Sequence, residues 1–164
     1  MEKILILNTG GTFNKRYNPL KGELEVPNDG IALEAILRYC NNTSYELLNI
    51  IHKDSLDMDE NDRELIVKTI QDSSCHKVLI IHGTDTMDVT ATFLALHVKD
   101  KIITLTGAMV PFSIDTVEAT SNFMLALGDL MCREKNGVNL AMHGAIAGHG
   151  SIYKNRQKGI FELC

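Results

Sequence analysis

The sequence of 164 residues has little of what would place it outside the ordinary soluble globular class. Proline occurs 3 times and glycine 12 times, which excludes a collagen-like or low-complexity chain. Its 16 basic and 21 acidic residues give a net charge of −5, so it lacks the basic excess needed to bind nucleic acid or an anionic membrane surface. No apolar run approaches the ~20 residues that span a bilayer. We therefore expect neither nucleic acid nor a membrane as a partner.

Cysteine is also scarce, and the four cysteines lie far apart at positions 40, 75, 132 and 164. No two of them have the spacing of a metal or redox motif. A disulfide framework requires an oxidising compartment, yet the apolar stretch at residues 4–7 is too short for a secretory signal. The sequence predicts a cytoplasmic protein with reduced thiols, and no metal or cofactor is expected.

The composition is 45% hydrophobic and 23% charged, which is typical of globular domains. A chain of this length can bury roughly 70% of its unfolded surface, so we expect residues 1–164 to form a single domain. Short apolar runs rich in Ile, Leu and Val indicate parallel strands that are buried on both faces. These runs cover residues 4–7, 47–51, 78–81, 102–105 and 138–142.

Amphipathic helical patterns lie between these runs. They are carried by Leu33, Ile36, Leu37 and Cys40; by Ile66 and Ile70; by Met87, Ala91, Leu94, Ala95 and Val98; and by Phe123, Leu127, Leu130 and Met131. We expect Asn28 to cap the first helix, Asp57 and Glu60 to open the second, and the segment 136–137 to end the fourth. This alternation predicts an α/β fold with three layers: a doubly wound, mainly parallel sheet with helices on both faces.

Polar segments follow four of the expected strands, at the edge of the sheet where ligands bind in such folds. They cover residues 8–12, 54–58, 82–87 and 106–109. This arrangement predicts a small-molecule site at the carboxyl ends of the strands.

The first of these segments contains Gly10, Gly11 and Thr12, where glycine lets the backbone approach a ligand closely. A phosphate loop is one interpretation, but the sequence has neither G-x-x-x-x-G-K-[ST] nor G-x-G-x-x-G. Residues 18–22 resemble a turn rather than a helix start. A nucleotide site and a simple tight turn both stay open as alternatives.

Thr84 and Asp85 precede an expected helix, where free backbone N–H groups can stabilise an oxyanion. The simpler interpretation is that one of the two caps that helix. A threonine hydroxyl becomes nucleophilic only when a base removes its proton, and a carboxylate with a nearby lysine can do this.

Taken together, these segments resemble the signatures of bacterial-type L-asparaginases, in the same order and at similar spacing. The resemblance rests on residues 9–12, 82–87 and 106–109, extends to residues 54–58 and 153–154, and covers essentially the whole chain. It implies the fold of the N-terminal domain of that family and hydrolysis of the side-chain amide of asparagine or a related small amide.

The resemblance also implies residue roles. Thr12 is expected to be the nucleophile that forms an acyl-enzyme, and Thr84, Asp85 and Lys154 a second, supporting triad. Asp85 is further expected to bind the α-ammonium group of the substrate, Ser55 its α-carboxylate, and the Ala108 carbonyl its leaving amide nitrogen. Gly11, Asp54, Leu56 and Gly83 complete the expected substrate contacts. Such a lysine has either a pKa well below ~10.4 or a fixed positive charge.

The sequence departs from the family pattern at several points. The family's loop tyrosine has Tyr17 as its nearest counterpart, either as a catalytic residue or as a half-exposed loop tyrosine. Leu56 replaces a polar residue that contacts substrate, and Val110 replaces an arginine. Family members are also roughly twice as long, with a second domain that completes the site across a subunit interface. We therefore expect a homo-oligomer, a dimer or tetramer, and keep a non-catalytic amino-acid or amide binding module as the alternative function.

Overall fold

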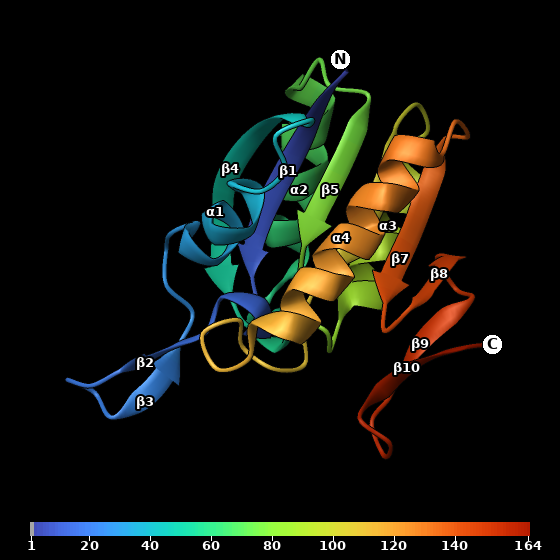
Figure 1. Cartoon of the computed structure of the whole chain (residues 1–164). Coiled ribbons are helices and arrows are strands. Elements are labelled where there is room, and N and C mark those ends of the chain that lie inside the picture. The colour runs from blue at the N-terminus through green and yellow to red at the C-terminus, as the bar shows by residue number, and fades with distance from the viewer. Residues whose placement is uncertain (1) are drawn as a thin grey trace.

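The computed structural model describes residues 2–164 and contains a six-stranded sheet with helices on both faces (Figure 1). The strand order is β4-β1-β5-β6-β7-β8; β8 is antiparallel to β7, and all other neighbours are parallel. This confirms the predicted doubly wound, mainly parallel fold. The sheet strands are β1 (Lys3–Gly10), β4 (Ser44–Lys53), β5 (Lys77–Ile81), β6 (Ile102–Thr106), β7 (Gly137–Met142) and β8 (Ala145–Gly148).

The direction of winding reverses next to β1. After β1, the chain places β4 on one side of β1 and then crosses over to place β5 on the other side. The strands after β5 continue away from β1, so the strand order reverses between β1 and β5. In doubly wound sheets, this switch point opens a crevice at the carboxyl ends of the two strands. The residues that follow Gly10 and Ile81 are therefore the first candidates for a ligand site.

Four helices form the outer layers: α1 (Ile31–Leu37), α2 (Glu60–Asp72), α3 (Met87–His97) and α4 (Thr116–Cys132). Helices α1 and α4 pack on one face of the sheet, where Leu33 and Phe123 are completely buried. Helices α2 and α3 pack on the other face, where Ile66 and Leu94 are completely buried. No helix within residues 2–164 is both long enough and apolar enough to cross a membrane.

Three expected helix boundaries are wrong. Gly30 rather than Asn28 is the N-cap of α1, and Asp29 accepts the Ile31 N–H instead. A reciprocal capping box of Asp59 and Asp62 opens α2, because Asp57 is already part of the 3₁₀ turn Ser55–Asp57. Helix α4 ends at Cys132, and Gly137 begins β7.

Two hairpins project from the carboxyl end of the sheet, at the bottom of Figure 1. The first pairs β2 (Arg16–Asn18) with β3 (Glu23–Glu25) around the expected turn. The second pairs β9 (Ile152–Asn155) with β10 (Ile160–Leu163). Both hairpins therefore lie beside the predicted site rather than within the main sheet.

Candidate active site

The loops that follow β1, β4, β5 and β6 touch one another through glycines. A Cβ atom added to Gly11 would lie 2.5 Å from the Gly83 Cα, and one added to Gly83 would lie 2.6 Å from the Ser55 Cβ. A Cβ atom on Gly107 would overlap the His82 carbonyl oxygen. Only a hydrogen fits at these positions, so the glycines allow four loops to converge on one point.

The loop after β1 presents Thr12 at this point. Gly11 has a left-handed backbone (φ 73°), its N–H donates to the Lys53 carbonyl at 2.9 Å, and Thr12 begins a 3₁₀ turn. The buried Asn14 donates to the Gly10 carbonyl at 2.7 Å and to Asn8 Oδ1 at 2.9 Å. The Thr12 side chain is half-buried, and its hydroxyl has no hydrogen-bond partner within residues 2–164. The loop is thus fixed on both sides of a hydroxyl that stays available.

The structure brings together three of the residues expected to act as a group. Lys154, on β9, donates from Nζ to Thr84 Oγ1 at 2.8 Å and to Asp85 Oδ1 at 2.9 Å. Thr84 is 6% exposed, and the lysine side chain is 15% exposed. Neither Thr84 nor Asp85 caps a helix, because α3 begins at Met87 with Thr86 at its N-cap. The capping interpretation of these two residues is therefore wrong.

Asp85 is held as a carboxylate by two cations. Burial works against its ionisation, but the hydrogen bonds and charges of Lys154 and Arg156 outweigh this effect and lower the pKa of Asp85. Both cations bind the same oxygen, Oδ1, and Arg156 also donates to the Asp85 carbonyl at 3.2 Å. Oδ2 therefore remains free to accept from a ligand.

Ser55 lies beneath this loop rather than at the surface. It is fully buried, and its Oγ accepts the backbone N–H groups of Asp85 at 3.2 Å and Thr86 at 3.3 Å. Its neighbours in the sequence have other surroundings: Asp54 forms an ion pair with Lys15 at 2.7 Å, and Leu56 is 66% exposed. Of the three expected substrate contacts in this segment, Ser55 is thus the one joined directly to the Thr84 loop.

A buried histidine supports the same loop from below. His82 Nδ1 lies 2.8 Å from the Gly83 carbonyl oxygen, and Nε2 lies 2.8 Å from Thr90 Oγ1. Arg63 donates to that threonine at 3.1 Å. Complete burial disfavours the imidazolium and lowers the pKa of His82 to about 4. His82 is therefore neutral at physiological pH and orients the loop through hydrogen bonds.

Two further predicted residues differ in their exposure. Ala108 is almost completely buried in a loop whose Gly107 carbonyl accepts from Asn122 Nδ2 at 2.9 Å. Tyr17 is 62% exposed on β2, opposite Leu24 of β3, and has no hydrogen bond to Thr12. The structure therefore does not bring Tyr17 into contact with the expected nucleophile.

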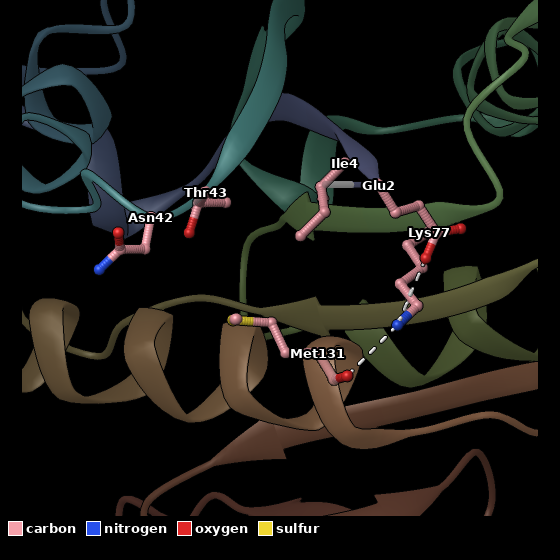
Figure 2. A pocket seen from close by; sticks show the side chains of 6 residues that line it. All are labelled: Glu2, Ile4, Asn42, Thr43, Lys77 and Met131. Carbon is pink, nitrogen blue, oxygen red and sulfur yellow. Dashed lines mark hydrogen bonds and ion pairs between the residues drawn. The ribbon is translucent and has the colours of Figure 1, made fainter.

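The cavity beside the Thr84 loop measures about 220 Å³ and is lined by polar groups including Thr84, Asp85 and Lys154. Another pocket, of about 170 Å³, lies at the amino ends of β1, β4 and β5 (Figure 2). There Lys77 donates to the Met131 carbonyl and pairs with Glu2, and none of its lining residues comes from the converging loops. Residues 2–164 hold no group of three or more His, Cys, Asp or Glu side chains placed to bind a metal ion. The chemistry available to the chain is thus concentrated at the carboxyl edge.

Sequence reasoning missed the residues that hold this site together. Arg156 lies only two positions after Lys154, so its positive charge could have indicated a second partner for Asp85. Asn14, Thr90 and Glu118 had no such signal, because each acts through a contact that only the folded chain creates.

The fold and the site together define a doubly wound α/β protein with a threonine–aspartate–lysine group at the carboxyl ends of its strands, near a second threonine. Residues 3–160 match the family described as "Asparaginase, N-terminal", and the chain belongs to this asparaginase family. It is 33% identical over 137 residues to "L-asparaginase 2" of Escherichia coli, which covers 77% of this chain and 38% of that protein. It is 30% identical over 167 residues to "Probable L-asparaginase periplasmic" of Haemophilus influenzae, covering 94% and 46% respectively.

Among solved structures, the thermostable L-asparaginase from Thermococcus kodakarensis superposes with a TM-score of 0.86 at 23% identity. That match covers 98% of this chain and 51% of the other. The chain therefore spans 38% to 51% of the length of these relatives, and the likeness to the solved structure, at 23% identity, concerns the fold.

Proposed function

We propose that this chain hydrolyses the side-chain amide of asparagine or a related small amide to the acid and ammonia. The observation that carries the proposal is the pair of hydrogen bonds from Lys154 Nζ to Thr84 Oγ1 and Asp85 Oδ1. Thr84 and Asp85 sit on the loop that touches the Thr12 loop through Gly11 and Gly83. A nucleophile and a separate proton-handling group are the two parts that amide hydrolysis requires.

Thr12 acts as the nucleophile in this proposal. Its Oγ attacks the amide carbonyl carbon, its proton passes to the leaving nitrogen, and the C–N bond breaks to release ammonia and leave an ester on Thr12. Water then attacks the ester carbonyl, and the C–O bond to Thr12 breaks, restoring the hydroxyl. The free Thr12 hydroxyl is consistent with this role, since no neighbour within residues 2–164 holds it in a competing hydrogen bond.

Thr84, Asp85 and Lys154 support both steps. Lys154 donates to Thr84 Oγ1, so the hydroxyl proton of Thr84 points away from the lysine. In this proposal that proton is available for a hydrogen bond to the reacting hydroxyl of Thr12. The low pKa of Asp85 keeps a negative charge next to the ammonium group of Lys154. The arrangement is already assembled, so it needs no reorganisation during the reaction.

We propose the substrate contacts from the same set of residues. Asp85 Oδ2 is open and can accept from the α-ammonium group of an amino-acid amide. Ser55 is proposed to bind the substrate carboxylate, because its Oγ accepts from two backbone N–H groups but retains its own proton for donation. The Ala108 carbonyl is proposed to accept from the leaving amide, and Gly11 and Gly83 to admit the substrate close to the backbone.

A non-catalytic module that binds an amino acid or amide is the second candidate. Leu56 favours it, because this 66% exposed apolar side chain stands where the resembled family has a polar substrate contact. The two candidates differ in turnover rather than in ligand.

We further propose that residues 1–164 form one domain and associate as a homo-oligomer, a dimer or tetramer, in the cytoplasm. Both core clusters pack on the same sheet, which supports a single domain. A site open to water at its rim gains orientation and water exclusion from a neighbouring subunit. Four unpaired cysteines are consistent with a reducing compartment. Light scattering of the purified chain measures the oligomeric state.

Ammonia release from L-asparagine, L-glutamine and succinamate tests the proposed activity. We expect release by the wild type, loss in Thr12→Ala, and no change in Thr92→Ala, an exposed threonine on the outer face of α3. A ligand that raises Tm without any ammonia release would instead establish the binding module.

A further inference from the structure

The hairpin that carries Lys154 is not part of the main sheet, so its position depends on a few contacts. Strands β9 and β10 form their own two-stranded sheet, in which Lys154 lies directly opposite Phe161. The Phe161 N–H points away from this hairpin and donates to His143 Nδ1 at 3.2 Å. The rings of His143 and Phe161 also meet edge to face, with centroids 5.9 Å apart. His143 thus holds the residue paired with Lys154.

His143 adopts a backbone conformation that its surroundings must stabilise. It follows β7 with φ 51°, in the left-handed region that non-glycine residues rarely enter. Its backbone N–H donates to Asn122 Oδ1 at 3.0 Å. Because Nδ1 accepts from Phe161, the ring proton is on Nε2, which donates to Glu118 Oε1 at 2.9 Å. Both ring nitrogens are therefore engaged.

Glu118 connects His143 to the loop that contains Ala108. Its two carboxylate oxygens accept the backbone N–H groups of Met109 and Val110, each at 2.8 Å. These residues directly follow Ala108, the proposed acceptor for the leaving amide. A second connection runs in parallel, because Asn122 donates to the Gly107 carbonyl while it accepts from His143.

We propose that His143, braced by Glu118, is a positioning residue that sets the distance between the Ala108 loop and Lys154. The inference rests on the proposed function for its catalytic consequence, whereas the structural connection stands on the contacts alone. A misplaced Lys154 loses its alignment with Thr84, and an error of about 1 Å in such a group can cost on the order of 100-fold in rate.

Two substitutions separate the contacts of His143. In His143→Asn, the side-chain oxygen can replace Nδ1 as the acceptor for the Phe161 N–H, and asparagine tolerates the left-handed backbone. In His143→Gln, the longer amide can reach Glu118, but no acceptor remains at the position of Nδ1. His149→Ala is the control, since His149 is exposed and only its backbone N–H is engaged.

The variants are compared by hydrogen exchange of the Phe161 amide and by kcat and KM for ammonia release. We expect His143→Gln to accelerate exchange about 10-fold or more and to lower kcat about 10-fold or more with a smaller change in KM. His143→Asn, which keeps an acceptor for Phe161 but loses the contact with Glu118, should keep exchange of the Phe161 amide within about 3-fold of the wild type and lower kcat less than His143→Gln does. His149→Ala should stay within about 3-fold of the wild type in both measurements. Wild-type values in His143→Gln, or equal losses in His143→Asn and His143→Gln, would overturn the proposal.

Two safeguards keep the test decisive. If the wild type releases no ammonia, the proposed function fails, and the exchange of the Phe161 amide alone decides whether His143 holds the hairpin. If His143→Gln does not fold, Glu118→Gln replaces it, because an amide nitrogen cannot accept from Met109 or Val110. Faster exchange of one of those two amides and a lower kcat then support the proposal, and unchanged values contradict it.

Discussion

The Gly11 and Gly83 backbones are in direct contact, with the position of a Gly11 Cβ atom only 2.5 Å from the Gly83 Cα. Each glycine precedes a threonine of the site, Thr12 in one loop and Thr84 in the other. The contact therefore brings two hydroxyl-bearing loops from separate strands to one point. This contact requires that neither residue has a side chain, so the site needs the two glycines as well as the threonines that follow them.

Gly83→Ala should push the Thr84 loop away from the Ser55 loop. The added methyl would lie 2.6 Å from the Ser55 Cβ and 2.7 Å from its Oγ, in a region with no free space. Overpacking of this kind costs about 1–3 kcal/mol of unfolding free energy, measured by urea denaturation. Gly128→Ala is the matched control, because no atom lies near its Cβ position on α4, and it should stabilise the helix by up to about 1 kcal/mol.

Lys154→Met should abolish ammonia release while the chain remains folded. The substitution removes the donor to Thr84 and leaves Asp85 with Arg156 as its remaining partner cation, so the pKa of Asp85 rises. Lys158→Met is the control on the same hairpin, since Lys158 is exposed and its side chain pairs, among residues 2–164, with Glu162 alone. Equal activity in the two variants would contradict the role of Lys154.

Buried His82 should make the protein less stable in mild acid. Its folded pKa is about 4, against about 6.5 in the unfolded chain, so only the unfolded chain binds this proton between those values. The unfolding free energy should therefore be highest above pH 6.5 and fall by roughly 3 kcal/mol as the pH approaches 4.

The histidine contribution is isolated by comparing variants across this pH range with urea denaturation. His82→Gln should flatten the pH dependence of the unfolding free energy between pH 4 and 6.5, whereas His149→Gln should leave it unchanged. Identical slopes in wild type and His82→Gln would show that this histidine is not responsible.

The sequence was sufficient for most of the fold, for a physical reason. Runs such as residues 78–81 and 102–105 are continuously or almost continuously apolar because their strands are buried on both faces, and this pattern needs no knowledge of the rest of the chain. Helix ends were less predictable. Asp29 and Asp59 compete with neighbouring polar residues for the same N–H groups, and only tertiary geometry decides between them.

The site was predictable in part for a related reason. Short motifs after each strand revealed Thr12, Thr84 and Asp85, because a doubly wound sheet gathers such loops at one edge. The supporting contacts could not be predicted, since Glu118 and His143 lie 25 positions apart and meet only across the turn that follows β7. Pairings between distant segments leave no local pattern.

Tyr17→Phe measures whether the β2–β3 hairpin takes part in the reaction. Because Tyr17 is 62% exposed, loss of its hydroxyl should leave the unfolding free energy within about 0.5 kcal/mol of the wild type. If the hairpin reaches the nucleophile during turnover, kcat should fall about 10-fold or more. Tyr39→Phe on the distant α1 end, at 81% exposure, is the control and should change neither quantity.

The most direct test of the account is the identity of the residue that becomes acylated. Rapid acid quenching of the chain during turnover of L-asparagine, followed by peptide mass spectrometry, locates a covalent intermediate. We predict an aspartyl ester on Thr12 that is absent from both Thr12→Ala and Lys154→Met. An ester on Thr84, or ammonia release by Thr12→Ala at the wild-type rate, would contradict the proposal that Thr12 is the nucleophile.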